Sequence, residues 1–149
     1  MTQLSPHFSL KELTVTSTGL SNTPTGQALA NLNYTAQQME LVRSILGKPI
    51  KVNSGYRSAA VNKAVGGSTT SAHSYGLAVD FVCPAFGSTR AICEALVEAG
   101  IKFDQLILEK PNSPTGGWVH IGFKQDGKGQ RQQILTFTGS KYLDGLVRY

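Results

Sequence analysis

The sequence predicts an α+β fold, in which a mainly antiparallel sheet has helices packed on one side. Helical spacing of apolar residues occurs early in the chain and once between strands, whereas strand-like segments cluster late. With 149 residues, of which 40% are hydrophobic, the chain can bury a core without help from a metal or a disulfide. We therefore expect a single domain over residues 1–149.

Helices are predicted first along the chain. Ser9 and Glu12 have the spacing of a capping box and predict a short helix after residue 9. From Pro24 to Leu46 the apolar residues recur at helical spacing and Gly47 follows them, which predicts one long helix.

Shorter elements follow, separated by glycine, proline and polar residues. They are predicted as a strand over residues 50–52, a helix over 58–65, a strand over 77–83, a helix over 88–100, and strands over 103–109, 118–123 and 132–137. The strands over 103–109 and 118–123 form a hairpin with a long loop, and a turn at residues 126–129 precedes the last strand.

The charge pattern narrows the class of partner. Fourteen Lys and Arg against nine Asp and Glu give a net charge of +5, scattered without a basic block or interleaved aromatics. This disfavours nucleic acid, and it suits a polyanionic carbohydrate or a carboxylate-rich peptide polymer equally well.

Several other classes are disfavoured by what the sequence lacks. The two cysteines are ten residues apart and form no disulfide framework. There is no signal-peptide pattern and no run of about 18 apolar residues. We expect a protein made in the cytoplasm that does not insert into a membrane, and a monomer by default.

Asp80 is the least expected residue, because the rest of the strand-like segment 77–82 is apolar. A buried carboxylate needs a cation, which can be a metal ion or the basic partner of a core salt bridge. His73 comes seven residues earlier, and Gly76 between them lets the chain fold back toward the strand.

His120 is the third member of this group. It alternates with apolar neighbours, so it lies on the face opposite to theirs, and Gly122 leaves room beside it. Singly, His73 reads as a surface residue and His120 as a hydrogen-bonded core histidine. Together with Asp80 they form the ligand set of a catalytic zinc site with one position open to water. A non-haem iron site uses the same ligand types, but the sequence shows no cosubstrate signature.

Four motifs carry a family resemblance that covers nearly the whole chain. They are Ser54-Gly55-Tyr56-Arg57-Ser58, Gly66-Gly67, Ser71-x-His73-x-x-Gly76-x-Ala78-x-Asp80 and Trp118-Val119-His120. These motifs resemble the zinc D-Ala-D-Ala carboxypeptidase family of peptidoglycan peptidases. The segment Phe8 to Leu13 is similar to the start of the small single-domain branch found in bacteriophages and bacteria.

The resemblance implies a fold shared with the hedgehog signalling domain and a Zn²⁺ ion held by His73, Asp80 and His120. It implies hydrolysis of a peptide bond in the stem peptide or cross-link of bacterial peptidoglycan, by a D,D-carboxypeptidase or an endopeptidase. It places Arg57 where the guanidinium could hold a substrate carboxylate or stabilise an oxyanion, whereas without it Arg57 reads as an ordinary surface residue.

The resemblance also suggests a biological setting. A wall peptidase without a signal peptide fits a phage endolysin, which accumulates in the host cytoplasm and reaches the wall after release. A particle-associated peptidase or a bacterial housekeeping enzyme would look alike. A metal-containing module that binds wall peptide or serves in morphogenesis without cleaving anything is the alternative from another class.

The general base is where the sequence departs from the family. The dipeptidase branch carries Glu three residues before the last histidine, and Gly117 occupies that place here. Among the nine acids, Asp104 and Glu109 remain as candidates, at the two ends of one predicted strand. The small branch has an acid at the end of this strand, so Glu109 is the preferred base and Asp104 the alternative.

Three further residues are candidates for supporting roles. Ser71 could hydrogen bond to His73 or to substrate, or it could simply cap its loop. Asn62, together with Gly66 and Gly67, is expected to set the turn that brings Arg57 toward the metal. Trp118 could line the substrate cleft, although a role as a core anchor is favoured.

Overall fold

The main sheet of the molecule has six strands in the order β3-β4-β6-β5-β7-β8. The computed structural model describes residues 2–125 and 128–149. The strands are β3 (Lys51–Ser54), β4 (Ala78–Val82), β5 (Gln105–Glu109), β6 (Trp118–Gly122), β7 (Gln133–Phe137) and β8 (Tyr142–Asp144). Neighbouring strands are antiparallel apart from β5 and β7, which are parallel.

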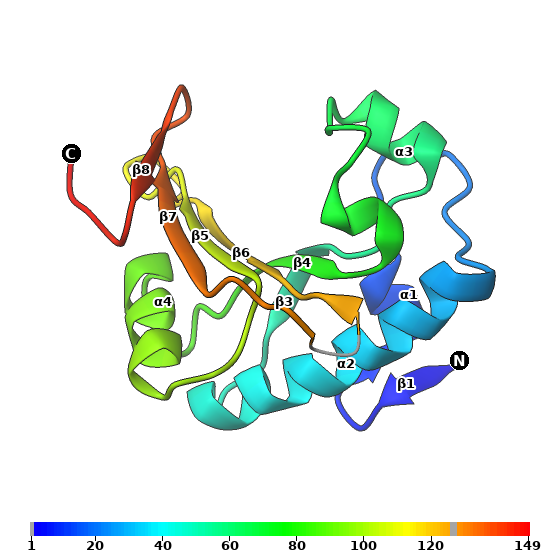
Figure 1. Ribbon diagram of the computed structural model, residues 1–149, viewed down its shortest axis with the longest axis horizontal. Coiled ribbons are helices and arrows are strands. Elements are labelled where there is room, and N and C mark those ends of the chain that lie inside the picture. The colour runs from blue at the N-terminus through cyan, green and yellow to red at the C-terminus, as the bar shows by residue number, and fades with distance from the viewer. Residues whose placement is uncertain (1, 126–127) are drawn as a thin grey trace.

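The helices lie on more than one side of this sheet. Helices α2 (Gly26–Leu46) and α4 (Thr89–Glu98) cover one face, whereas α3 (Ala59–Ala64) and the 3₁₀ helix η1 (Ala72–Tyr75) stand beside the other (Figure 1). The α+β class matches the expectation, but the helices are not confined to one side. The likeness to the hedgehog domain stays a prediction.

The core forms between the sheet and the two long helices because strand residues alternate between faces. Val79 and Phe81 of β4 and Val119 and Ile121 of β6 are fully buried against this helical layer. The residues between them, including Asp80 and His120, therefore point to the opposite face.

Local sequence signals account for most of the helix ends. Helix α1 (Leu10–Leu13) has the predicted capping box, with Ser9 and Glu12 bonded to each other's backbone. Gly47 ends α2 in the left-handed conformation, and the Ser88 side chain caps α4.

Other elements were not predicted, because they are short and lack clear apolar periodicity. They are β1 (Gln3–Ser5), β2 (Phe8–Ser9), η1 and β8. Part of the turn expected at residues 126–129 lies outside the described residues. Among the described helices, none combines the length and apolar character needed to cross a membrane.

Candidate metal centre

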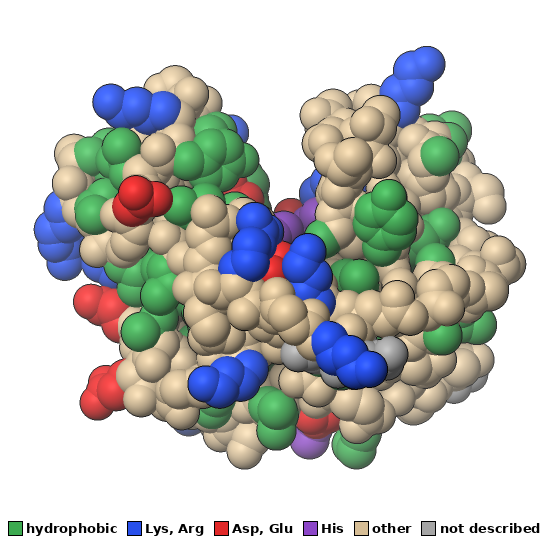
Figure 2. Space-filling model, viewed as in Figure 1, with side chains coloured by type: hydrophobic (Ala, Val, Ile, Leu, Met, Phe, Trp, Pro, Cys, Tyr) green, Lys and Arg blue, Asp and Glu red, His purple; other side chains and the backbone are tan. Residues whose placement is uncertain are grey.

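A deep hollow opens on the sheet face that α2 and α4 leave uncovered. Figure 2 shows it as a notch between two lobes, with histidine side chains at its bottom. The cavity has a volume of about 430 Å³, and seven of the predicted site residues line it. They are Arg57, Ser71, His73, Asp80, Glu109, Trp118 and His120.

The pairing of β4 with β6 brings two of these side chains together. Asp80 is directly opposite His120, so both point to the open face, and Ala78 is opposite Gly122 in the same way. The His120 Nδ1 atom lies 2.9 Å from Asp80 Oδ1. A Cβ at Gly122 would make only ordinary contact with the His120 ring, so room for that ring does not require glycine there.

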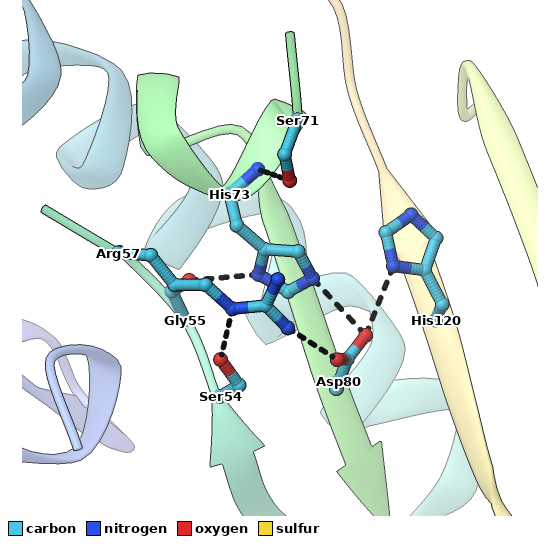
Figure 3. A network of polar contacts seen from close by, with 7 residues as sticks. All are labelled: Ser54, Gly55, Arg57, Ser71, His73, Asp80 and His120. Carbon is cyan, nitrogen blue, oxygen red and sulfur yellow. Dashed lines mark hydrogen bonds and ion pairs between the residues drawn. The ribbon is translucent and has the colours of Figure 1, made fainter. Parts of the chain in front are cut away.

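His73 reaches the same carboxylate from η1. The Ser71 hydroxyl accepts a hydrogen bond from the His73 backbone N–H at the start of η1, and Gly76 ends it with a φ of +75°. This left-handed residue turns the chain into β4. The His73 Nε2 atom then lies 3.2 Å from Asp80 Oδ1 (Figure 3).

The other ring nitrogen of His73 is fixed by the backbone. The Nδ1–H group donates to the Gly55 carbonyl at 2.8 Å, which leaves Nε2 free to act as a ligand. Gly55 is itself packed against Leu13, whose carbonyl accepts from the Tyr56 N–H at 2.7 Å. Burial above all lowers the pKa of His73 and so favours the neutral imidazole that metals bind.

The three side chains form a group that could hold a metal ion. One ligand atom from each of His73, Asp80 and His120 lies within 4.8 Å of the others, and all three residues are buried. Two imidazoles and one carboxylate suit zinc, and the three protein ligands leave a coordination position for water. In its chemistry the donor set therefore fits the predicted ion.

Arg57 supplies the nearest positive side chain. Its Nη2 group donates to Asp80 Oδ2 at 3.3 Å, and its Nε–H donates to the Ser54 hydroxyl at 3.1 Å. Burial raises the pKa of Asp80, but its interactions with His73 and His120 outweigh this effect and hold that pKa well below its usual range. Asp80 is thus ionised and ready to bind a cation.

Glu109 shares the open face with this group. On β5 it is two residues beyond Ile107, which is opposite His120, and Glu109 itself is opposite Trp118. Its half-buried carboxylate makes no hydrogen bond or ion pair to any residue that the structure describes. Burial raises the pKa of Glu109, and the positive charges of neighbouring groups only partly offset this.

Asp104, the alternative base, is already engaged. Arg131 donates to Asp104 from its Nε, Nη2 and backbone N–H groups at 2.9 to 3.1 Å. Burial raises the pKa of Asp104, but the hydrogen bonds from Arg131 have the larger, opposite effect, so the pKa lies below its ordinary value. Asp104 is therefore a weaker proton acceptor than Glu109.

Gly117 explains why the base cannot stand three residues before His120. Its φ is +70°, and a Cβ there would overlap the carbonyl of Glu109. A glutamate at this position would require the β5–β6 loop to take another path.

The supporting residues are placed as follows. The Asn62 amide donates to the Ser68 carbonyl at 2.7 Å and abuts Gly67, which in turn lies next to Arg57. Trp118 is half-buried and lines the hollow, whereas the buried apolar cluster does not include it, so the favoured role as a core anchor is not what the structure shows. The reason is its alternation with Val119, which takes the core face.

The contact between Gly55 and Leu13 gives a first testable prediction. In Gly55→Ala the added Cβ overlaps the Leu13 carbonyl, so the backbone must shift and the Gly55 carbonyl moves relative to His73. We expect the free energy of unfolding to fall by about 1–3 kcal/mol and metal affinity to fall by about tenfold or more. Chemical denaturation and metal titration measure the two effects.

Gly122→Ala is the matched control. Its added Cβ makes only ordinary contacts near His120. We expect a loss of less than about 1 kcal/mol and near-normal metal affinity. Equal behaviour of the two variants would contradict the role given to Gly55.

Several residues of the hollow were not predicted from the sequence. Tyr142 lines it from β8, with its ring 4.5 Å from that of Phe137 between centroids. Lys124 and Arg131 line it near Asp104. The sequence shows only that these residues lie in or beside the predicted strands. Whether they reach the hollow depends on how β7 and β8 extend the sheet, which the sequence does not indicate.

Comparisons with known proteins agree with this geometry. A family profile described as Peptidase M15 matches residues 6–121. Over 54 residues, or 36% of this chain, the sequence is 44% identical to a protein named zinc D-Ala-D-Ala carboxypeptidase from Streptomyces albus G. The match spans 21% of that relative's length, so most of the relative has no counterpart in the match.

Proposed function

The chain belongs to the Peptidase M15 family, and on that premise we propose that it is a zinc peptidase acting on a peptide bond of bacterial peptidoglycan. One observation carries the proposal: His73, Asp80 and His120 converge from η1, β4 and β6 at the bottom of an open hollow. The 44% identity to a zinc carboxypeptidase supports both the metal and the substrate class.

His73, Asp80 and His120 are the proposed zinc ligands. A bound Zn²⁺ ion supplies Lewis acidity, which polarises a carbonyl and lowers the pKa of water to about 7. The protein holds the ligands ready for the ion: the Gly55 carbonyl orients His73, and Arg57 keeps the Asp80 carboxylate in place.

Glu109 is the proposed general base. It lines the same hollow and shares the face of His120, and it has no partner among the described residues that would compete for its lone pairs. A carboxylate with a raised pKa holds a proton more readily, so Glu109 can accept the proton of the attacking water and return it to the leaving amine. Asp104 is bound by Arg131 and is a poorer candidate.

Arg57 is the proposed electrophilic residue. Ser54 and Asp80 each engage one part of its guanidinium, which fixes the group beside the ligands. The remaining N–H groups can donate to the developing oxyanion or to a substrate carboxylate. Asn62 and Gly67 support this position of Arg57. Ser71 fixes the start of η1, and Trp118 lines the side of the hollow.

A wall-digestion assay tests the proposal. We expect the purified protein to release soluble peptides from isolated peptidoglycan, a chelator to abolish the release, and added Zn²⁺ to restore it. Binding to the wall without release would favour the non-cleaving module instead. Restoration by ferrous iron but not by zinc would contradict the assignment of the metal.

The finer features of the activity are proposals of the same kind. Residues 1–149 are proposed to form one catalytic domain that acts as a monomer. Mass spectrometry of the released fragments distinguishes a D,D-carboxypeptidase from an endopeptidase. The endolysin role, with accumulation in the cytoplasm of a phage-infected host, stays a prediction from the sequence.

A further inference from the structure

The charges that line the hollow are unevenly distributed along β5. The described lining residues include three positive side chains and three negative ones. They are Arg57, Lys124 and Arg131 against Asp80, Asp104 and Glu109. Arg57 pairs with Asp80 at the centre, Glu109 is at one end of β5, and the remaining three charges gather at the other end.

This second group, formed by Asp104, Lys124 and Arg131, is called the basic end. The carboxylate of Asp104 is buried and takes two side-chain hydrogen bonds from Arg131, at 3.1 and 2.9 Å. The Lys124 Nζ atom lies 3.9 Å from the same carboxylate. One negative charge therefore faces two positive ones, which leaves a net charge of +1 at this end.

The basic end is accessible to a ligand. The side chains of Lys124 and Arg131 are 49% and 54% exposed, whereas that of Asp104 is 10% exposed. Figure 2 shows Lys and Arg side chains grouped at the near mouth of the hollow, with an acidic side chain between them. The buried anion thus anchors two cations whose outer N–H groups remain open to solvent and to substrate.

Small and neutral residues separate the basic end from the metal ligands. On the open face Gly122 is opposite both Ala78 and Gln105, and Gln105 is opposite Gln133. The Gln105 and Gln133 amides bond to each other at 2.8 Å and carry no charge. An extended peptide lying over His120 can therefore reach the basic end without passing another acidic group of the described lining.

We infer that Lys124 and Arg131 form a carboxylate-binding subsite at the end of the hollow away from Glu109, and that these two residues set the preference of the cleft among carboxylate-bearing peptides. The inference rests on the proposed function and names the substrate class that the cleft prefers. Lys124 is the main donor, because Arg131 already uses its fork on Asp104. Electrostatic attraction to this end lowers KM and leaves the chemical step unchanged.

Two forms of one substrate test the subsite. Soluble stem peptides from a single wall preparation are used with their carboxylates free, and again after conversion of the carboxylates to carboxamides. We expect the unmodified protein to have a KM about threefold to fivefold lower for the free form, and the difference to shrink as salt is added.

Lys124→Gln and Lys48→Gln make a matched pair, because each removes one positive charge and Lys48 is exposed and does not line the hollow. We expect Lys124→Gln to lose most of the preference for the free form, with kcat unchanged, and Lys48→Gln to keep it. Equal KM values for both forms, or a preference that survives in Lys124→Gln, would overturn the inference.

Failure of the proposed function would look different. In that case neither form is cleaved, and the affinity of both forms for the protein, measured by calorimetry, still decides the inference. Tighter binding of the free form that depends on Lys124 supports the subsite even without cleavage. Equal binding of the two forms contradicts it.

Discussion

Asp80→Ala is expected to lose bound zinc and peptidoglycan hydrolysis together. The carboxylate is the only acidic member of the ligand group, and it also partners His73, His120 and Arg57. Its removal leaves the Arg57 guanidinium, whose side chain is 17% exposed, without its counter-charge. Loss of one partner of such an ion pair costs about 3 kcal/mol, so the variant should also unfold more easily.

Two further variants separate chemistry from folding. Asp80→Asn keeps the shape of the side chain and should fold better than Asp80→Ala, while still binding zinc far more weakly. Asp144→Asn removes an exposed carboxylate from β8 and should behave as the unmodified protein. Metal content by atomic spectroscopy, circular dichroism and wall lysis are measured on each. Normal zinc content in a folded Asp80→Asn protein would contradict the ligand assignment.

Glu109→Gln is expected to separate metal binding from catalysis. The side chain keeps its size but can no longer accept a proton, so hydrolysis should fall by about two to four orders of magnitude. Zinc content should stay normal, because Glu109 is not among the three grouped ligands. Asp104→Asn is the comparison that tests the alternative base. If it reduced the rate as much as Glu109→Gln, the base assignment would be wrong.

The raised pKa of Glu109 gives this variant a second signature. Burial holds the pKa of Glu109 above its ordinary value in the metal-free fold. A raised pKa in the folded state also means that ionised Glu109 destabilises the metal-free fold. Glu109→Gln should therefore stabilise the metal-free protein at neutral pH, and this gain should vanish below the ordinary glutamate pKa.

Much of the ligand group could be predicted from sequence because it follows from local rules. Strand alternation placed His120 on the face away from its apolar neighbours, and Asp80 stood out as the one carboxylate in an apolar strand. Gly76, which the structure shows in the left-handed conformation, accounted for the return of His73 toward that strand. The same alternation put Glu109 on a face with Gln105 and Ile107, as the pairing with β6 bears out.

The rest depends on contacts that no local pattern encodes. Strand β5 lies between β6 and β7, and it is antiparallel to β6 but parallel to β7. This parallel pairing brings Arg131, which precedes β7, next to Asp104, which precedes β5. The position of Tyr142 at the side of the hollow depends in turn on how β8 pairs with β7. Such placements are decided by the order of strands in the sheet, and the spacing of residues along the chain does not reveal that order.

The support behind His73 is made of main-chain atoms: the Gly55 carbonyl holds the ring, and the Leu13 carbonyl holds the turn that carries Gly55. Because every residue type has a main-chain carbonyl, these two contacts do not themselves select the side chain at position 13. The strict requirement is for glycine at position 55, because a Cβ there would overlap the Leu13 carbonyl.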